Sequence, residues 1–510
     1  MRSFFDWYYK ECSKNEPWLV LGKGPSFDKY TDYDLTKFNL ISLNHVVCKL
    51  PVKVAHIIDL DVVEACAIDI DKNAAYLVLP WVPHVNNKPG HHNLKECIQQ
   101  NSLLAKLSQE NRLLYYNHLP KKRFGDDPLV EVTYFSSEAV ISLLSLCEVK
   151  TIRTLGIDGG NTYNRAFNYL NNITLLANGR KSFNKQFGQM AKIIMKTGLD
   201  LAPLDIDAPI KVYVASTEAQ MLAVKVLEYS IRKHASMSVE VIPLHLNSID
   251  IPLPKDKANW PRTPFSFQRF LIPELQQYAG RAVYLDSDMQ VFRDIKDLWI
   301  MPFNGAQILT VKNADQSERR PQFSVMLIDC ASLPWSIKEI VTKLDSHHLT
   351  YEKLMYEMAV ADKVDVTIET GWNSLENFDA DQTSLLHYTD MNIQPWISKD
   401  NPLGYLWFRD LFEAIDSNFI SMEFIKEHVT LGYVRPSLMY QVEKRIEDSL
   451  LLPKVAVQMD TFYKPPYQDM PHVKNSFSRG KLVIKAYLRS IFNNQFFYKI
   501  RKIYSYFDRS

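Results

Sequence analysis

The 510-residue sequence has few cysteines, no long apolar run and almost no net charge. Its six cysteines are scattered without a C-x-x-C pair or framework spacing, so we expect reduced thiols and a cytoplasmic protein. No stretch has 18 uninterrupted apolar residues, which excludes a membrane-spanning helix. Residues 1–16 mix charged and aromatic residues and lack the apolar segment that a signal peptide requires. Export by that route is therefore not expected.

The composition is that of a folded α/β protein, with 46% hydrophobic and 23% charged residues. The length allows two to four domains. The net charge of +1 hides an asymmetry. From Lys474 to Ser510 there are nine Lys or Arg and one acid, a net of +8, which leaves 50 basic and 57 acidic residues, a net of −7, in the rest.

Apolar residues recur at helical spacing within this basic C-terminal segment: Ile484, Tyr487, Leu488, Ile491, Phe492, Phe496, Ile500, Ile503 and Phe507. A basic amphipathic helix with aromatic residues is typical of a segment that lies on anionic lipid, which would place the protein on the inner face of the plasma membrane. The alternative is a terminal helix that docks on the protein's own body or on a second subunit of a homo-oligomer. We expect no nucleic-acid partner, because the rest of the chain is acidic and carries no RNA-binding signature.

The first part of the chain alternates short apolar runs with helical patterns. Strands are predicted at residues 18–21, 40–43, 54–58, 76–79 and 151–155, and a helix at 136–147. This order predicts a Rossmann-like domain with a parallel sheet covered on both faces, whose ligand edge is formed by the polar residues that follow the strands.

A glycine turn, Gly22-Lys23-Gly24-Pro25-Ser26, follows the first of these strands. Such a turn brings backbone N–H groups close enough to cradle an anion, although it is neither a Walker loop nor a G-x-G-x-x-G motif. The alternative is a simple turn. Asn44 follows the second strand, and Gly156-Ile157-Asp158 follows the last.

Over roughly residues 17–166 these motifs resemble those of the family 42 sialyltransferases, and of the motility-associated-factor and pterin-pyrophosphokinase-like proteins. The resemblance implies that Gly22, Gly24, Ser26, Asn44 and Asp158 line a nucleotide pocket. Those sialyltransferases take a histidine base from the segment after G-I-D, but here no histidine lies between positions 118 and 234. We therefore expect a domain with different chemistry, such as a pyrophosphokinase or a second transferase, or a structural platform.

Residues 201–210 contain two prolines and no helical periodicity, and are predicted to be an interdomain linker. The predicted domains are residues 1–205, residues 211–440 and a basic C-terminal extension at 441–510. The second domain begins with an apolar run at 211–215. Thr217 and Gln220 then fit a capping box ahead of a helix.

Asp286-Ser287-Asp288 directly follows the apolar run 282–285. In an extended chain, residues i and i+2 point to the same side, so the two carboxylates face one place at the end of a buried strand. Two unpaired carboxylates repel each other there unless a divalent cation relieves the repulsion. His387 offers a third ligand, and the set suits Mn²⁺ or Mg²⁺ with open positions for phosphate oxygens.

Three motifs occur in order: Arg269 to Pro273, Tyr284-Leu285-Asp286-Ser287-Asp288, and His387 followed by Gln394-Pro395-Trp396. Over roughly residues 211–412 they resemble glycosyltransferase family 8 and its GT-A relatives. The resemblance implies a GT-A fold, a UDP-sugar or other nucleotide-sugar donor, and a glycan or lipid-linked glycan acceptor, with retention at the anomeric carbon. It also implies a setting in bacterial surface polysaccharide assembly.

The resemblance assigns roles to further residues. Asp286 and Asp288 hold the metal and the diphosphate, with His387 as third metal ligand, and Ser287 between them belongs to the donor-binding residues. Residues 215–217, which are Ala215, Ser216 and Thr217, stand where family members hold the nucleotide base, although the capping box gives Thr217 an alternative role.

Arg269 is either a phosphate contact or a surface ion-pair partner. Gln394 replaces the phosphate-binding Lys of the family, and Asp390 replaces a Gly. Asn373, Asp381 and Gln382 are candidates for the acceptor side. Two other functions remain open: an activity that resides in the first domain, and a non-enzymatic scaffold.

Overall fold

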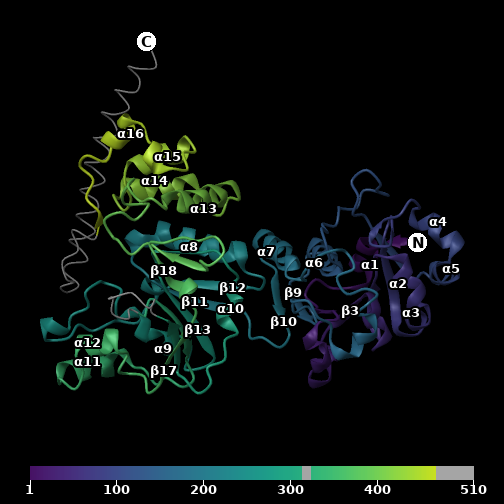
Figure 1. The fold of residues 1–510 in the computed structure, drawn as a ribbon, viewed down its shortest axis with the longest axis horizontal. Helices are drawn as coiled ribbons and strands as arrows, with labels where there is room; N and C mark the ends of the chain where they lie inside the picture. The colour runs from purple at the N-terminus through teal and green to yellow at the C-terminus, as the bar shows by residue number, and fades with distance from the viewer. Residues whose placement is uncertain (313–322, 467–510) are drawn as a thin grey trace, which may run out of the picture. The chain divides into compact units, whose positions relative to one another are not determined.

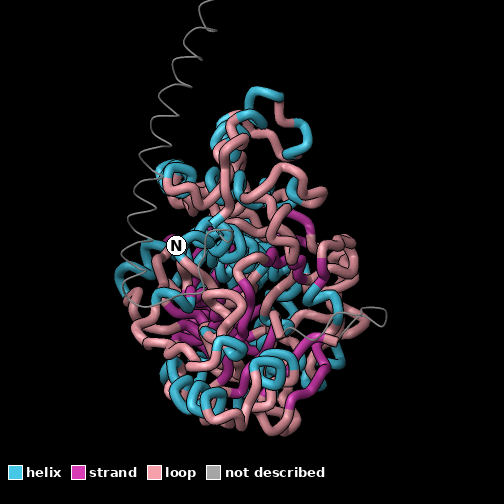
Figure 2. Tube along the Cα trace, turned by 90° about the vertical axis from the view of Figure 1, so that its left-hand side faces the viewer, coloured by secondary structure: helices cyan, strands magenta, loops and turns pink. Residues whose placement is uncertain are grey.

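The computed structural model describes residues 1–312 and 323–466, which divide by their contacts into two units. The first unit comprises Met1–Pro209 and Ala235–Val239, and the second comprises Ile210–His234 and the chain from Glu240 onward. Both are α/β, as predicted, with strands enclosed by helices and loops (Figures 1 and 2). No helix in the described part of the chain has the length and apolar character needed to cross a bilayer.

The sheet of the first unit has eight parallel strands in the order β1-β8-β5-β4-β3-β2-β9-β10. Their bounds are β1 Arg2–Ser3, β2 Trp18–Leu21, β3 Asn39–Leu43, β4 Val52–His56, β5 Ala74–Pro80, β8 Leu113–Tyr116, β9 Thr151–Leu155 and β10 Asp200–Pro203. The five strands predicted from the sequence are confirmed as β2, β3, β4, β5 and β9. A small hairpin pairs β6 (His84–Val85) with β7 (Lys88–Pro89).

The prediction of a linker from residue 201 is wrong for its first three residues. They belong to β10, which pairs with β9, and Leu201 and Ala202 are buried. Pro203 is compatible with this strand because β10 lies at the sheet edge, where a missing N–H is tolerated. The backbone N–H of Ser238 donates to the carbonyl of Leu201 at 2.8 Å, so residues 235–239 extend the contacts of this edge.

Helices cover both faces of this sheet: α1 Phe4–Glu11, α2 Leu60–Ala65, α3 Ala67–Asn73, α4 Leu94–Gln100, α5 Ser102–Gln109, α6 Ser136–Leu146 and α7 Lys185–Thr197. The predicted helix at 136–147 is confirmed as α6. Along β2, Trp18 and Val20 join the apolar cluster that contains α1, α6 and α7, whereas Leu19 and Leu21 join the cluster of α2 to α5. Burial on both faces explains why the strands are almost continuously apolar.

The strand order reverses direction beside β2. From β2 the chain adds β3, β4 and β5 on one side, and later β9 and β10 on the other. In open α/β sheets the crevice at the carboxyl ends of such strands is where ligands bind. The glycine turn after β2 and Gly156-Ile157-Asp158 after β9 both lie at this switch point.

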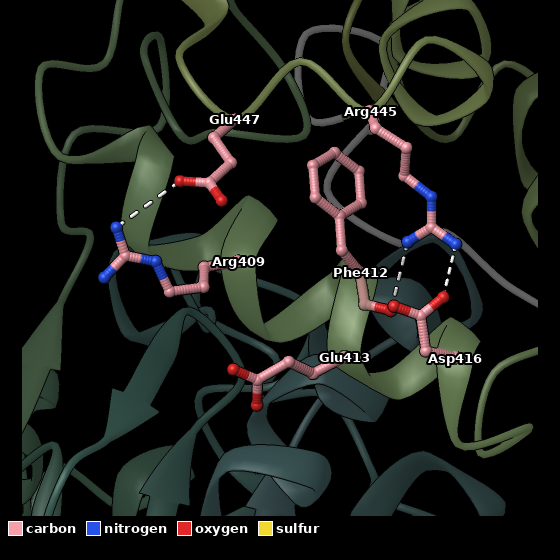
Figure 3. A pocket seen from close by; sticks show the side chains of 6 residues that line it. All are labelled: Arg409, Phe412, Glu413, Asp416, Arg445 and Glu447. Atoms are coloured by element: carbon pink, nitrogen blue, oxygen red, sulfur yellow. Dashed lines mark hydrogen bonds and ion pairs between the residues drawn. The ribbon is translucent and has the colours of Figure 1, made fainter.

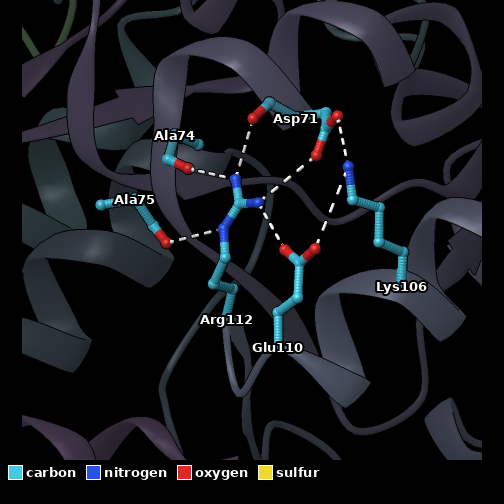
Figure 4. A network of polar contacts seen from close by, with 6 residues as sticks. All are labelled: Asp71, Ala74, Ala75, Lys106, Glu110 and Arg112. Atoms are coloured by element: carbon cyan, nitrogen blue, oxygen red, sulfur yellow. Dashed lines mark hydrogen bonds and ion pairs between the residues drawn. The ribbon is translucent and has the colours of Figure 1, made fainter.

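A polar network ties the end of α3 to the start of β8 (Figure 4). The guanidinium of Arg112 donates to the carbonyl oxygens of Asp71, Ala74 and Ala75 at 2.9, 2.8 and 3.3 Å. Arg112 also pairs with the carboxylates of Asp71 and Glu110, and Lys106 pairs with Asp71. Carbonyl groups that the end of α3 leaves without intrahelical partners are thus satisfied by a side chain.

The second unit contains a six-stranded mixed sheet in the order β12-β11-β13-β16-β15-β17. The strands are β11 Ile210–Ala215, β12 Val239–Pro243, β13 Arg281–Asp286, β15 Ile308–Val311, β16 Val325–Asp329 and β17 Val364–Ile368. The predicted strands at 211–215 and 282–285 are confirmed as β11 and β13, which run parallel. A separate three-stranded sheet joins β14 Met289–Val291, β19 Leu385–His387 and β18 Ser374–Leu375.

The helices of the second unit are α8 Met221–His234, α9 Ile272–Leu275, α10 Lys296–Trp299, α11 Ile337–Asp345, α12 Tyr351–Tyr356, α13 Gly404–Asp416, α14 Met422–Thr430, α15 Ser437–Glu443 and α16 Lys454–Gln458. Within this unit α11 and α12 lie at one end, and α13 to α16 gather at the other (Figure 1). The predicted capping box of Thr217 and Gln220 is present ahead of α8.

Residue 441, where we predicted the C-terminal extension to begin, lies inside α15, and the described residues up to 466 belong to the second unit. The predicted basic amphipathic helix falls on residues 467–510, which lie outside the described residues.

We expect Gly156→Ala to destabilise the full-length protein by about 2–4 kcal/mol, because it combines a positive-φ penalty with overpacking. Gly156 has φ of +74°, and a Cβ there would lie 2.2 Å from the carbonyl oxygen of Gly22. Gly198→Ala is the matched control, since Gly198 has φ of +66° but open space where a Cβ would lie. Urea unfolding of both variants measures the difference. Equal losses would show that the close approach of the two turns contributes nothing.

Candidate metal centre and donor site

The acidic pair lies at the carboxyl end of the central strand β13. Asp286 is the last residue of β13, and Asp288 stands immediately before β14. β14 pairs antiparallel with β19 so that Met289 is opposite His387, and the N–H of Tyr388 donates to the carbonyl of Asp288 at 2.8 Å. This pairing carries His387 to the acidic pair across 99 residues of sequence.

The three predicted metal ligands lie together. Asp286, Asp288 and His387 each offer one ligand atom, and these atoms are within 4.8 Å of one another. His387 Nε2 is 3.1 Å from Asp288 Oδ1, and His387 Nδ1 is 2.9 Å from the side-chain oxygen of Asn373. Because that amide oxygen can only accept, Nδ1 carries the proton and Nε2 is the nitrogen available to a metal.

The electrostatics of the cluster favour a cation. Burial lowers the pKa of His387, but the charge and hydrogen bond of Asp288, with the charges of Asp286 and Glu376, outweigh burial and raise the pKa overall. His387 is only 2% exposed, and the carboxylates beside it are partly buried, so solvent screens their charge less than it would at an open surface. The same negative field attracts a metal ion.

Buried neighbours hold Asp286 in place. The hydroxyl of Tyr284 donates to Asp286 Oδ1 at 2.6 Å, and a guanidinium nitrogen of Arg269 lies 3.7 Å from the same oxygen. Burial, and to a lesser degree Asp286, raises the pKa of Tyr284 well above its usual range, so the hydroxyl keeps the proton that it donates. Arg269 is 4% exposed and also donates to the carbonyl of Phe323 at 3.0 Å, so its ion pair is interior and not at the surface.

Asp288 is held on its other oxygen. Gln394 Nε2 donates to Asp288 Oδ2 at 2.9 Å and to the carbonyl of Tyr388 at 3.0 Å. Ser287, between the two aspartates, is 1% exposed, and its buried hydroxyl has no hydrogen-bond partner among the described residues. Two carboxylates and one imidazole nitrogen fit a divalent cation.

The end of β11 lies beside the metal cluster, because Ala215 is in register with Asp286. Gln268 holds the next residue: its side-chain oxygen accepts from the N–H of Ser216 at 3.0 Å, and its nitrogen donates to the carbonyl of Ser216 at 2.9 Å. The hydroxyl of Ser216 is 2.8 Å from His245 Nδ1. Ser216 itself is fully buried, and Thr217 has the capping role already described.

Several supporting residues were not predicted from the sequence. Gln268, His245 and Tyr284 carried no recognised signal for these contacts, although Tyr284 lies inside the motif that identified the aspartates. Asn373 was a candidate for the acceptor side, whereas its side-chain oxygen contacts His387. Asp381 and Gln382 lie in an exposed turn.

In the first unit the glycine turn is packed directly on the turn after β9. The N–H groups of Gly22 and Gly24 donate to the carbonyls of Leu155 and Gly156 at 2.8 and 2.7 Å. The N–H of Ser26 donates to Asp158 Oδ2 at 2.7 Å, and its hydroxyl bonds to Asp158 Oδ1. These N–H groups already have acceptors, so the predicted anion cradle is wrong for all three.

Other polar groups at the switch point lack partners among the described residues. The side-chain oxygen of Asn44 is buried without a hydrogen bond, while its nitrogen donates to Ser136 at 3.3 Å. His45 is 6% exposed, and its Nδ1 is also without a partner. Burial and the nearby charge of Lys23 lower the pKa of His45 to about 4.

Lys23 is a largely buried cation without a carboxylate counter-ion in the described part of the chain. Its Nζ donates to the hydroxyl of Thr174 at 3.3 Å and lies 4.3 Å from the ring centre of Tyr163. Burial lowers the pKa of Lys23 to about 8. A buried cation without a counter-ion is costly and is well suited to an anionic ligand.

A charged groove at the α13 end of the second unit is a different kind of surface (Figure 3). Arg409 pairs with Glu447 at 3.4 Å, and Arg445 pairs with Asp416 and donates to the carbonyl of Phe412. Opposite charges therefore satisfy one another along this groove.

Comparisons with known proteins agree with the site. Residues 166–337 match the family described as Glycosyl transferase family 8. The matched segment contains both aspartates and ends before His387. It supports the predicted family resemblance of the second domain and its fold class, whereas the family 42 resemblance of the first domain stays a prediction.

Individual relatives are distant. "Protein CDI" of Arabidopsis thaliana is 35% identical over 96 residues, which are 18% of this chain and 36% of that protein. The chain thus spans little more than a third of this curated relative. Among solved structures, the galactosyltransferase LgtC in complex with donor and acceptor sugar analogs is 11% identical, with a TM-score of 0.31, covering 42% of this chain and 99% of that one. GlyE of Streptococcus pneumoniae TIGR4 is 16% identical, with a TM-score of 0.30, covering 40% and 60%.

Lys23→Met should stabilise the ligand-free protein at pH 7, by at most about 3 kcal/mol, because it removes a buried charge. The folded-state pKa of Lys23, about 8, lies below its ordinary value of 10.5. As pH rises from 8 to 10.5 the folded state releases this proton first, so wild-type stability rises and the advantage of the variant shrinks. Unfolding midpoints of both proteins at pH 7 and pH 9.5 measure this. If the difference in stability between the variant and the wild type is the same at both pH values, the lowered pKa of Lys23 is contradicted.

Proposed function

We propose that the second unit is a metal-dependent glycosyltransferase. It transfers a sugar from a nucleotide diphosphate sugar, with UDP as the expected nucleotide, to a glycan or lipid-linked glycan, with retention of anomeric configuration. The observation that carries this proposal is the cluster of Asp286, Asp288 and His387 at the end of β13. The family 8 match over the segment that contains both aspartates supports it independently.

The chain's own residues prepare the site for a departing diphosphate. Asp286, Asp288 and His387 would hold Mn²⁺ or Mg²⁺, which supplies positive charge where the leaving group gains negative charge. Tyr284 and Arg269 fix Asp286, and Asn373 fixes the tautomer of His387. Gln268 holds Ser216, which follows Ala215, the residue in register with Asp286, and the resemblance would put the nucleotide base at this position.

The proposed setting is bacterial surface polysaccharide assembly in the cytoplasm, with the acceptor at the inner face of the plasma membrane. All six cysteines are free thiols, as a reducing compartment requires. The basic C-terminal segment supplies the charge for contact with anionic lipid.

Asp288→Asn should reduce donor-sugar hydrolysis by at least about 100-fold, because metal stabilisation of the leaving group is a matter of several kcal/mol. The same change should abolish Mn²⁺-dependent thermal stabilisation by UDP. Asp329→Asn, at the end of β16 and outside the metal cluster, is the control for loss of a carboxylate. Undiminished turnover in the Asp288 variant would remove the cluster from the mechanism.

A second candidate function resides in the first unit, and Lys23 at the switch point, which has no carboxylate partner among the described residues, favours it. The ligand would be a nucleotide or another phosphate compound whose charge pairs with the ammonium. A thermal-shift screen with CMP, UDP, GDP and ATP, with and without Mn²⁺, separates the two sites. A shift that survives Asp286→Ala and disappears in Lys23→Met locates binding in the first unit. No shift with any nucleotide would favour a non-enzymatic scaffold.

Deleting residues 479–510 should release the protein from vesicles that contain anionic lipid, because this segment carries eight of the nine basic residues that follow position 473. Soluble donor hydrolysis should be unchanged. Sedimentation with vesicles of phosphatidylserine and phosphatidylcholine checks the first expectation, and a homo-oligomer interface would appear instead as a change in mass by light scattering. Unchanged vesicle binding contradicts the membrane role.

A further inference from the structure

Each aspartate of the metal cluster has one oxygen engaged by a neutral side chain of the protein. Tyr284 donates to Asp286 Oδ1 at 2.6 Å, and Gln394 donates to Asp288 Oδ2 at 2.9 Å. The oxygen of Asp288 that faces His387 Nε2 is the other one, Oδ1, at 3.1 Å. The two carboxylates therefore each present one particular oxygen to the cluster.

The side chain of Gln394 has no free N–H group that could donate to a phosphate. A side-chain amide has two N–H protons, and Gln394 Nε2 uses both, on Asp288 Oδ2 and on the carbonyl of Tyr388. Its oxygen is an acceptor, which does not bind phosphate oxygens. The side chain is 6% exposed, so it is not free to turn without breaking both bonds. In this arrangement Gln394 has no N–H left for a phosphate contact of the kind that the family Lys makes.

We propose that Gln394 is a positioning residue for the metal ligand Asp288. By holding Oδ2, it leaves Oδ1 to the cation, and Tyr284 does the same for Asp286. The second bond, to Tyr388, fixes the residue that directly follows His387. One amide thereby sets the relation between Asp288 and His387. This inference rests on the proposed metal-dependent function.

The arrangement has a consequence for the choice of metal. Ca²⁺ takes six to eight oxygen ligands and often binds carboxylates through both oxygens, whereas Mn²⁺ accepts fewer ligands and an imidazole nitrogen. Aspartates limited to one oxygen each, with a histidine as third ligand, select against Ca²⁺. Loosening Asp288 should weaken Mn²⁺ binding and also narrow the preference for Mn²⁺ over Ca²⁺.

Two substitutions of similar volume test this in the full-length protein. Gln394→Met removes the donor without leaving a cavity, and Gln394→Glu replaces the donor by a carboxylate that repels Asp288. The control is Gln458→Ala on an exposed part of α16. Mn²⁺ binding is measured by electron paramagnetic resonance without nucleotide, with competition by Ca²⁺, and thermal unfolding checks that each variant is folded.

We expect Gln394→Met to weaken Mn²⁺ binding by about 10- to 100-fold, the usual effect of losing a partner of a metal ligand. Gln394→Glu should weaken it at least as much, and the control should match the wild type. Mn²⁺ affinity equal to wild type in the Met variant overturns the inference. Tighter binding in the Glu variant also overturns it, because residue 394 would then face the cation directly.

Donor hydrolysis separates positioning from phosphate binding. If Gln394 acts through Asp288, saturating Mn²⁺ should restore the donor KM of Gln394→Met to the wild-type value. A donor KM that stays raised at saturating Mn²⁺ overturns the inference and assigns Gln394 to the diphosphate. If the wild type binds Mn²⁺, Asp286→Ala abolishes that binding and the Gln394 variants bind Mn²⁺ as tightly as the wild type, only this inference is refuted. Folded wild-type protein that binds no Mn²⁺ refutes the proposed function as well.

Discussion

The antiparallel pairing of β14 with β19 is the contact on which the candidate site depends. It places Met289 opposite His387 and lets the N–H of Tyr388 bond to the carbonyl of Asp288. Without this short ladder, the end of β13 would present two carboxylates and no nitrogen ligand. The backbone thus assembles the cluster, and the side chains around it only refine the orientation of each ligand.

The side chains around the cluster give the two aspartates different partners. Asp286 receives a buried phenol and a buried guanidinium, whereas Asp288 receives an amide and an imidazole. The guanidinium of Arg269 also stacks 4.6 Å from the ring centre of Tyr284, so the partners of Asp286 support each other. A permanently charged guanidinium beside Asp286, against an amide and a titratable imidazole beside Asp288, makes the two carboxylates chemically unequal despite their similar place in the sequence.

Local pattern was enough to predict the elements that are apolar and bounded by turn residues. Strands β2 to β5, β9, β11 and β13 were predicted because burial on both faces of a sheet leaves a continuous apolar run. Strand β10 was missed, since Pro203 and the neighbouring acids read as a linker until its pairing with β9 is known. Short strands such as β14 and β19 exist only through their tertiary pairing, which no local pattern encodes.

The same distinction applies to the sites. The metal ligands were predictable because a cation requires particular residue types, and the family motifs supplied their order. Contacts among Gln394, Asp288 and Tyr388 were not, since a glutamine in the place of a lysine gives no sign of the direction in which its amide turns. In the first unit, the glycines suggested an anion cradle, but their N–H groups serve the packing of two turns. Glycines in the sequence predict a tight turn, but they do not predict which acceptors the N–H groups of that turn bind.

The return of residues 235–239 to the first unit has a consequence for biosynthesis. Their contact with β10 forms only after β11 and α8, both parts of the second unit, have left the ribosome. A nascent chain that has emerged only to Pro209 still lacks the partner for the carbonyl of Leu201. The first unit is therefore completed only after part of the second unit has been translated. A fragment that ends at Pro209 would lack residues 235–239, and its edge strand β10 would be open to pairing with strands of other molecules.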